Sequence, residues 1–126
     1  MKHLFTLFAI VLLLQSFQCE EDKPSTLSPE NLNQKKAAIE TYIATFPCEE
    51  SLGCSFLAFG SKPCGGPWSY LVFSNAVDLE FLTAEVLEYN EMENQFNLET
   101  GAVSDCAVVL PPTAVGCMDG ICGVIN

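Results

Sequence analysis

The sequence predicts an α+β domain in which two helices pack on a small antiparallel sheet of about four or five strands, cross-linked by three disulfides. Two segments, residues 28–46 and 78–101, carry apolar residues at helical spacing between capping signals. Short apolar runs bounded by glycine and proline predict strands. An even set of six cysteines in the domain is typical of disulfides formed in an oxidising compartment.

Residues 1–18 have the features of a secretory signal peptide. Lys2 and His3 precede a predominantly apolar run from Leu4 to Leu14, which gives the basic start and short hydrophobic region of such a signal. The run is too short to span a bilayer. A buried N-terminal helix is the alternative, which is disfavoured because no polar face interrupts the run.

Cys19 follows this segment and begins the acidic stretch Cys19-Glu20-Glu21-Asp22. The arrangement resembles a bacterial lipoprotein signal with the surface-export signal of Bacteroidetes lipoproteins. We therefore expect Cys19 to be lipidated, residues 19–27 to form a flexible acidic tether, and residues 28–126 to be one folded domain. Ser16-Phe17-Gln18 departs from the usual residues before the cysteine, so the alternative is ordinary secretion.

The other six cysteines are expected to form the three disulfides: Cys48, Cys54, Cys64, Cys106, Cys117 and Cys122. Bonds Cys48–Cys54 and Cys117–Cys122 are both sterically feasible, but the sequence does not choose among the connectivities. A four-cysteine zinc site is disfavoured, because no two cysteines have the spacing of a zinc ribbon or finger.

The chain is strongly acidic, with 5 basic residues against 16 acidic ones and a net charge of −11. Removal of the signal leaves 4 − 16 = −12. Such a chain repels phosphate backbones and anionic lipids, so we expect no nucleic-acid partner. Contact with a membrane is expected through the lipid anchor alone, and a protein partner is expected at the cell surface.

Each predicted helix has a recognisable start and end. Ser28 caps the first helix, Pro29 takes its first position, and Pro47 ends it after Phe46. Its apolar stripe contains Leu32, Ile39, Tyr42, Ile43 and Phe46. The second helix runs from an Asp78 cap to Gly101. Its stripe contains Leu79, Leu82, Val86, Tyr89, Glu93 and Phe96. The glutamates on its other face do not predict a calcium site, because no turn with Asp, Asn and Gly ligands accompanies them.

The strands are predicted between these helices and after them. Residues 55–59 and 69–74 are expected to pair as antiparallel core strands, and residues 103–110 to form a third strand before Pro111-Pro112. Asp119-Gly120 predicts a hairpin of residues 114–118 and 121–125, with Met118 opposite Ile121 and Cys117 opposite Cys122.

The connection between the first two strands is the candidate binding loop. Its candidate residues are Ser61, Lys62, Pro63, Gly65, Gly66 and Trp68. A rigid loop held by Cys64 would present aromatic surface at small entropic cost, and substitutions at Lys62 are expected to change binding without changing stability. The favoured interpretation is that the loop is only a corner between two core strands, with Trp68 and Tyr70 facing the core; binding would then use the exposed edge from Ser61 to Gly66. Phosphate binding is disfavoured because a strand, and not a helix, follows Gly65-Gly66.

Catalysis has little support in the sequence. The single histidine, His3, lies in the signal, so the mature domain has no Ser-His or Cys-His pair. Carboxylate pairs could do acid and base work, but their spacing in the sequence singles out no two that must converge in a cleft. We expect a protein that is not an enzyme and has no cofactor and no metal.

Five stretches carry a resemblance to a family: Gly60–Pro67 (GSKPCGGP), Tyr70–Ser74, Tyr89-Asn90, Ser104-Asp105-Cys106 and the Cys117–Cys122 hairpin. Over residues 48–126 the chain resembles an uncharacterised family of small, cysteine-rich lipoproteins of Bacteroidetes. The resemblance implies an exported lipoprotein and supplies no activity. We expect a non-enzymatic binding or structural lipoprotein of the outer membrane or cell surface; alternatives are a secreted or periplasmic protein, or a protease inhibitor presenting Pro63–Trp68.

Overall fold

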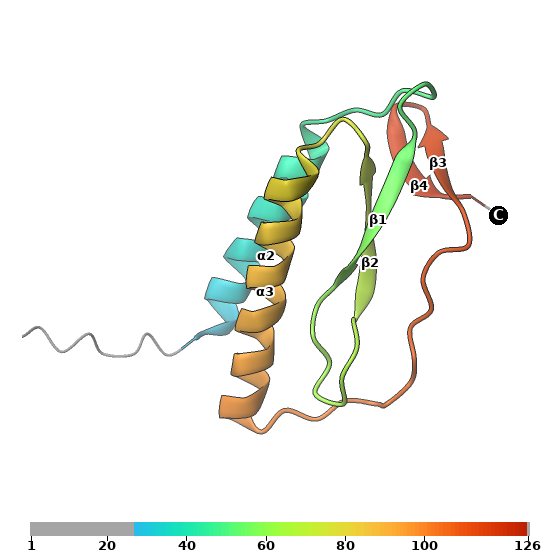
Figure 1. The fold of residues 1–126 in the computed structure, drawn as a ribbon. Coiled ribbons are helices and arrows are strands. Elements are labelled where there is room, and N and C mark those ends of the chain that lie inside the picture. The colour runs from blue at the N-terminus through green and yellow to red at the C-terminus, as the bar shows by residue number, and fades with distance from the viewer. Residues whose placement is uncertain (1–26, 126) are drawn as a thin grey trace, which may run out of the picture.

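The computed structural model describes residues 27–125. The predicted signal peptide, Cys19 and the tether up to residue 26 lie outside the described residues. The elements are α2 (Pro29–Ala44), β1 (Cys54–Phe59), β2 (Ser69–Ser74), α3 (Leu79–Thr100), β3 (Val115–Met118) and β4 (Ile121–Val124), as Figure 1 shows. The predicted α+β class, with two helices, antiparallel strands and three disulfides, is confirmed.

Both helices begin at the predicted caps. The Ser28 hydroxyl accepts the backbone N–H of Asn31, and the Asn31 side chain accepts the backbone N–H of Ser28. Asp78 accepts the N–H of Phe81, and α3 ends at Gly101 in the left-handed conformation with φ of 64°. The first helix ends two residues before the predicted Phe46, since its last helical residue is Ala44.

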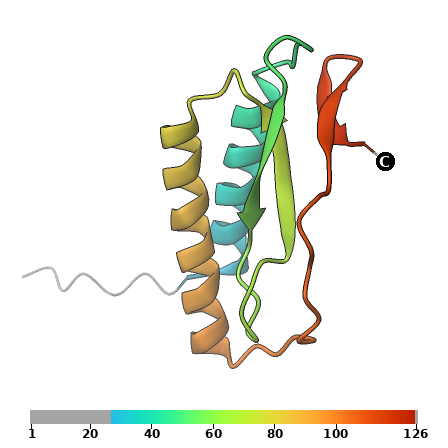
Figure 2. The same ribbon diagram turned by 45° about the vertical axis from the view of Figure 1, so that its right-hand side comes forward.

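The main core lies between the helices and the β1–β2 sheet. In Figure 2, α2 and α3 lie side by side on one side of β1 and β2. The buried cluster contains Leu32, Ile39, Phe59, Phe73, Val77, Leu82, Val86 and Tyr89. Both predicted helical stripes therefore face the core, apart from Leu79, which is exposed in the first turn of α3, and Glu93, which is half-buried outside the core cluster.

The four strands form two separate two-stranded sheets, whereas we expected one sheet. β1 and β2 are antiparallel from Cys54↔Ser74 to Phe59↔Ser69. β3 and β4 form the predicted hairpin, with Cys117 opposite Cys122 and Met118 opposite Ile121. The hairpin contacts the first sheet from the side away from the helices (Figure 2), and it shares no ladder of backbone bonds with that sheet.

The predicted strand over residues 103–110 is wrong, because this segment has no regular structure. A strand persists only where its backbone groups pair with a neighbouring strand. Here the carbonyl of Ala107 accepts a bond from the Lys62 side chain, and the carbonyl of Val109 accepts one from the Tyr70 hydroxyl. The exposure of Val103 and Val108 agrees with a segment that crosses the surface.

The disulfides join Cys48 to Cys117, Cys54 to Cys122 and Cys64 to Cys106. The two local pairings considered from the sequence, Cys48–Cys54 and Cys117–Cys122, are therefore both wrong. Each bond attaches the C-terminal part of the chain, which has few buried side chains, to the strands or to the loops beside them. Among the helices of residues 27–125, none combines the length and apolar character that crossing a bilayer requires.

Candidate functional site

Helix α3 holds one side of the loop that connects β1 and β2. The backbone N–H of Gly60 donates to Asn90 Oδ1 at 2.7 Å, and the N–H of Ser61 donates to Glu93 Oε2. The Asn97 amide donates to the carbonyl of Ser61 at 2.7 Å. Asn90, Glu93 and Asn97 lie three and four residues apart, so they share one helix face.

Lys62 holds the other side of the loop. Its ammonium donates to Asp105 Oδ1 at 2.8 Å and to the carbonyl of Ala107 at 2.9 Å. It also lies 5.1 Å from the ring centroid of Trp68. The hydrogen bond from Lys62, and then its charge, lower the pKa of Asp105 below its ordinary value. We expected Lys62 at an exposed edge, but its side chain is only 5 % exposed because the segment containing Asp105 covers it.

The tip of the loop is a tight turn. The N–H of Gly65 donates to the carbonyl of Lys62 at 2.8 Å, and the N–H of Lys62 donates to the carbonyl of Gly66 at 2.9 Å. Gly65 and Gly66 have φ of 93° and 82°, which favours glycine. Pro63 is half-buried, whereas Cys64 and both glycines are exposed beside the Cys64–Cys106 disulfide.

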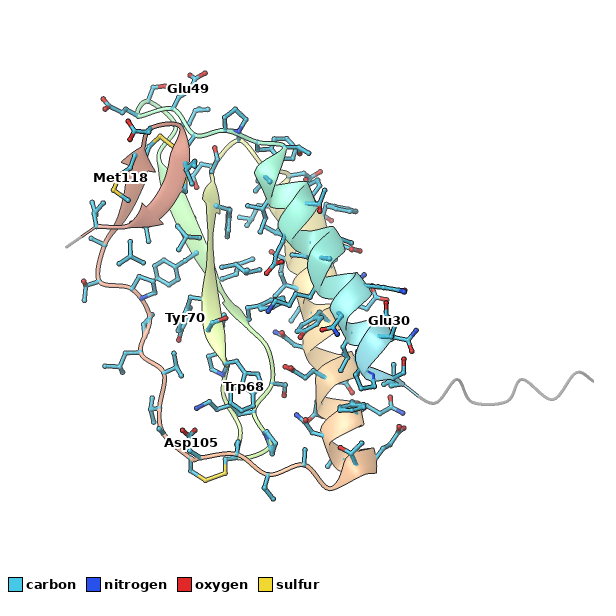
Figure 3. All side chains as sticks on the ribbon, turned by 180° about the vertical axis from the view of Figure 1, so that it is seen from behind. Glu30, Glu49, Trp68, Tyr70, Asp105 and Met118 are labelled. Carbon is cyan, nitrogen blue, oxygen red and sulfur yellow. A yellow bond between two sulfur atoms is a disulfide. The ribbon has the colours of Figure 1, made fainter. Side chains whose placement is uncertain are left out.

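Trp68 is 44 % exposed, so the expectation that it faces the core is wrong. Gly60 allows this placement: a Cβ there would lie 2.8 Å from Trp68 Cδ1 and 3.0 Å from Glu93 Oε2. Tyr70 is half-buried, and its hydroxyl donates to the carbonyl of Val109 at 3.4 Å. Figure 3 shows Trp68 and Asp105 at the end of the domain opposite Met118.

A pocket of about 240 Å³ lies beside Trp68. It is lined by Lys36, Phe59, Gly60, Trp68, Ser69, Tyr89 and Glu93. The rings of Phe59 and Tyr89 stack with centroids 4.4 Å apart, and the Tyr89 hydroxyl donates to Glu93 Oε1 at 3.3 Å. Burial, followed by the charge of Glu93 and its hydrogen bond, raises the pKa of Tyr89 to about 12. We call this the Trp68 pocket.

A second pocket, of about 290 Å³, lies between the end of α2, strand β2 and strand β4. Its walls are mainly apolar and include Ile43, Phe46, Val72 and Ile121, and none of its lining residues is charged. The Trp68 pocket combines aromatic rings with a lysine and a glutamate, which together can recognise a specific polar ligand. We therefore take the Trp68 pocket as the candidate site.

The six cysteines of residues 27–125 do not offer a metal site in this oxidation state. The sulfurs of Cys48, Cys54 and Cys122 lie within 4.8 Å of one another. All three are in disulfides, and a disulfide sulfur lacks the thiolate that binds a metal.

Of the loop residues predicted from the sequence, the structure places Trp68 in the pocket wall and the glycines at the tip, and it buries Lys62. Sequence reasoning did not identify Glu93, Tyr89 and Lys36 as site residues. A signal for Glu93 was present, because this glutamate falls within the apolar stripe of α3. A charged residue in a buried stripe needs a polar partner, which the loop supplies here.

The chain matches no family model, no curated protein and no solved structure. The fold and the site define it as a small α+β domain, cross-linked by disulfides, with an aromatic pocket at one end of its strands.

Proposed function

We propose that this protein is an exported lipoprotein, anchored through Cys19 at the outer membrane or cell surface, whose folded domain is a non-enzymatic binding module. The signal-like residues 1–18 and the cysteine that follows them support the anchor. Three disulfides in so short a chain are compatible with an oxidising compartment outside the cytosol.

The observation that carries the binding role is the half-exposed Trp68 on a preformed pocket. The chain contains one tryptophan, and it is 44 % exposed. The backbone beneath it is held by α3, and the loop before it is held by Lys62 and a disulfide. An aromatic side chain on a rigid support loses little conformational entropy on binding.

The pocket groups are suited to holding a ligand more than to transforming one. At neutral pH Tyr89 stays protonated, because its pKa is about 12. Glu93 accepts bonds from the Ser61 N–H and the Tyr89 hydroxyl, so its carboxylate helps to hold the loop and the Tyr89 ring in place.

The geometry of the loop does not favour the protease-inhibitor alternative. Lys62, the basic side chain that such a loop would offer to a protease pocket, is 5 % exposed and bonded to Asp105. The Lys62–Gly66 segment is also closed on itself by two backbone bonds, so its backbone is not free to pair with a protease as an extended strand.

Expression of the full chain in a Gram-negative bacterium tests the anchor. We expect mass spectrometry to show a mature N-terminus at Cys19 with acyl groups, and a Cys19→Ser variant to leave the membrane fraction. A mature Cys19 without acyl groups would contradict the anchor.

A second experiment tests the binding role with the domain lacking the anchor. We expect the wild-type domain to retain a component of outer-membrane extracts that the Trp68→Leu variant does not retain. Leu98→Ala is the matched control, because Leu98 is 75 % exposed and does not line the pocket. Equal retention by Trp68→Leu and wild type would rule out the pocket as the binding site.

A further inference from the structure

Glu93 places a carboxylate in the wall of the Trp68 pocket without a basic partner among residues 27–125. The ion pairs of this part of the chain join Lys35 to Glu85 and Glu88, Lys36 to Glu40, and Lys62 to Asp105. Glu93 accepts one bond from the Ser61 N–H and one from the Tyr89 hydroxyl. An ionised carboxylate has about four acceptor positions, so it retains capacity for a charged ligand.

Three aromatic side chains form part of the pocket wall, beside Lys36, Gly60 and Ser69. Phe59, Trp68 and Tyr89 line the pocket together with Glu93. The face of an aromatic ring is electrically negative and attracts cations. The fold itself uses this property, since the Lys62 ammonium lies 5.1 Å from the Trp68 centroid.

The surrounding charge favours the same sign of ligand. Burial is the largest cause of the raised pKa of Tyr89, and the negative charges of Glu93 and Glu40 raise it further. The electrostatic potential at this position is therefore negative. The chain has a net charge of −11. Lys36 is the one cation among the residues that line the pocket. Its ammonium lies 4.0 Å from a carboxylate oxygen of Glu40, and its side chain is half-exposed. Water and the Glu40 carboxylate therefore screen its charge.

We propose that the Trp68 pocket binds a small alkylammonium group. Among such groups, trimethylammonium best matches a pocket that combines a carboxylate with aromatic rings. The carboxylate of Glu93 would neutralise its charge, and the rings of Trp68, Tyr89 and Phe59 would contact its methyl groups. The volume of about 240 Å³ accommodates such a group. This inference rests on the proposed binding function and names its ligand class.

Titration of the disulfide-intact domain with choline tests the inference. The fluorescence of Trp68 reports binding at the site, because the chain has no other tryptophan. Dimethylbutanol, the uncharged isostere in which carbon replaces the nitrogen of choline, is the matched ligand. We expect choline to change the fluorescence with saturation and the isostere to bind at least about tenfold more weakly. Equal binding of the two ligands, or no binding of choline together with no retention on phosphatidylcholine vesicles, would overturn the proposal.

The Glu93→Gln variant tests the charge separately, because glutamine keeps an oxygen for the Ser61 N–H. We expect its choline affinity to fall by about tenfold. Glu91→Gln, a change at an exposed position of the same helix, should leave the affinity unchanged. An equal affinity in Glu93→Gln and wild type would overturn the role of the carboxylate, and the comparison of the two ligands stays decisive if Glu93→Gln does not fold.

Two arms distinguish the source of the group. Binding of free choline without retention on phosphatidylcholine vesicles identifies a soluble ligand, and retention on these vesicles identifies a lipid headgroup. Failure of both arms overturns the ligand class. The proposed function would still hold after such a failure if Cys19 is acylated and if the Trp68→Leu variant no longer retains an outer-membrane component.

Discussion

Replacement of Lys62 by alanine separates a structural role for this side chain from the contact role that the sequence predicted. The side chain crosses from the loop to the segment after α3, where it bonds to Asp105 and to the carbonyl of Ala107. Its stem is buried, since the side chain is 5 % exposed. A contact residue would change binding alone, whereas a buried one changes the free energy of unfolding.

The expected loss of unfolding free energy in Lys62→Ala follows from the burial of the Lys62 side chain. Alanine removes three methylene groups, and at about 0.8 kcal/mol for each the loss is about 2.4 kcal/mol. The ion pair adds little, because Asp105 is 71 % exposed and regains water when Lys62 is removed. The cost of burying the ammonium roughly offsets its bond to Ala107 and its contact with Trp68. We expect Lys62→Ala to cost about 2 kcal/mol, and Lys62→Met, which keeps the apolar stem, to cost less than about 1 kcal/mol.

Urea unfolding of the disulfide-intact protein measures both values. Far-ultraviolet circular dichroism is the appropriate signal, because Trp68 touches the mutated side chain and its fluorescence would change for a local reason. If Lys62→Ala unfolds within about 0.5 kcal/mol of wild type, the burial argument fails. If Lys62→Met is as costly as Lys62→Ala, the charge and not the stem carries the stabilisation.

Three further predictions address the same end of the domain. Loss of the Cys64–Cys106 disulfide, which closes a separation of 42 residues, should destabilise the fold by up to about 4 kcal/mol in the chain-entropy account; an unchanged thermal transition in the double alanine variant would contradict this. Tyr89 should form its phenolate at about pH 12, with that absorbance step absent from Tyr89→Phe. Because the folded pKa lies above the ordinary 10.0, its contribution to stability is complete below pH 10.0 and is lost as the pH rises through about 12. Gly60→Ala should displace Trp68 and weaken ligand binding, since Gly60 has φ of 86° and the new Cβ would lie 2.8 Å from the indole; unaltered Trp68 fluorescence in this variant would refute the close contact.

The local elements could be predicted from the sequence alone. Ser28 and Pro29 start α2, and Asp78 and Gly101 bound α3, because a cap depends on residues within one turn of the helix. The Asp119-Gly120 hairpin was predictable for the same reason, since the turn sets the register of its own strands. The even number of cysteines indicated the disulfides without their pairing.

Features that depend on residues distant in the sequence became evident in the folded chain alone. Cys48 and Cys54 bond to cysteines 69 and 68 residues away, because the hairpin packs on the face of the first sheet and brings those sulfurs together. Residues 103–110 have the composition of a strand, but no strand lies beside them to take their backbone bonds. The same segment covers Lys62, whereas Trp68 remains exposed. The loop between β1 and β2, which the sequence indicated as a candidate binding loop, therefore supports the Trp68 pocket. Burial and pairing of this kind arise from the packing of whole elements, which no short stretch of sequence encodes.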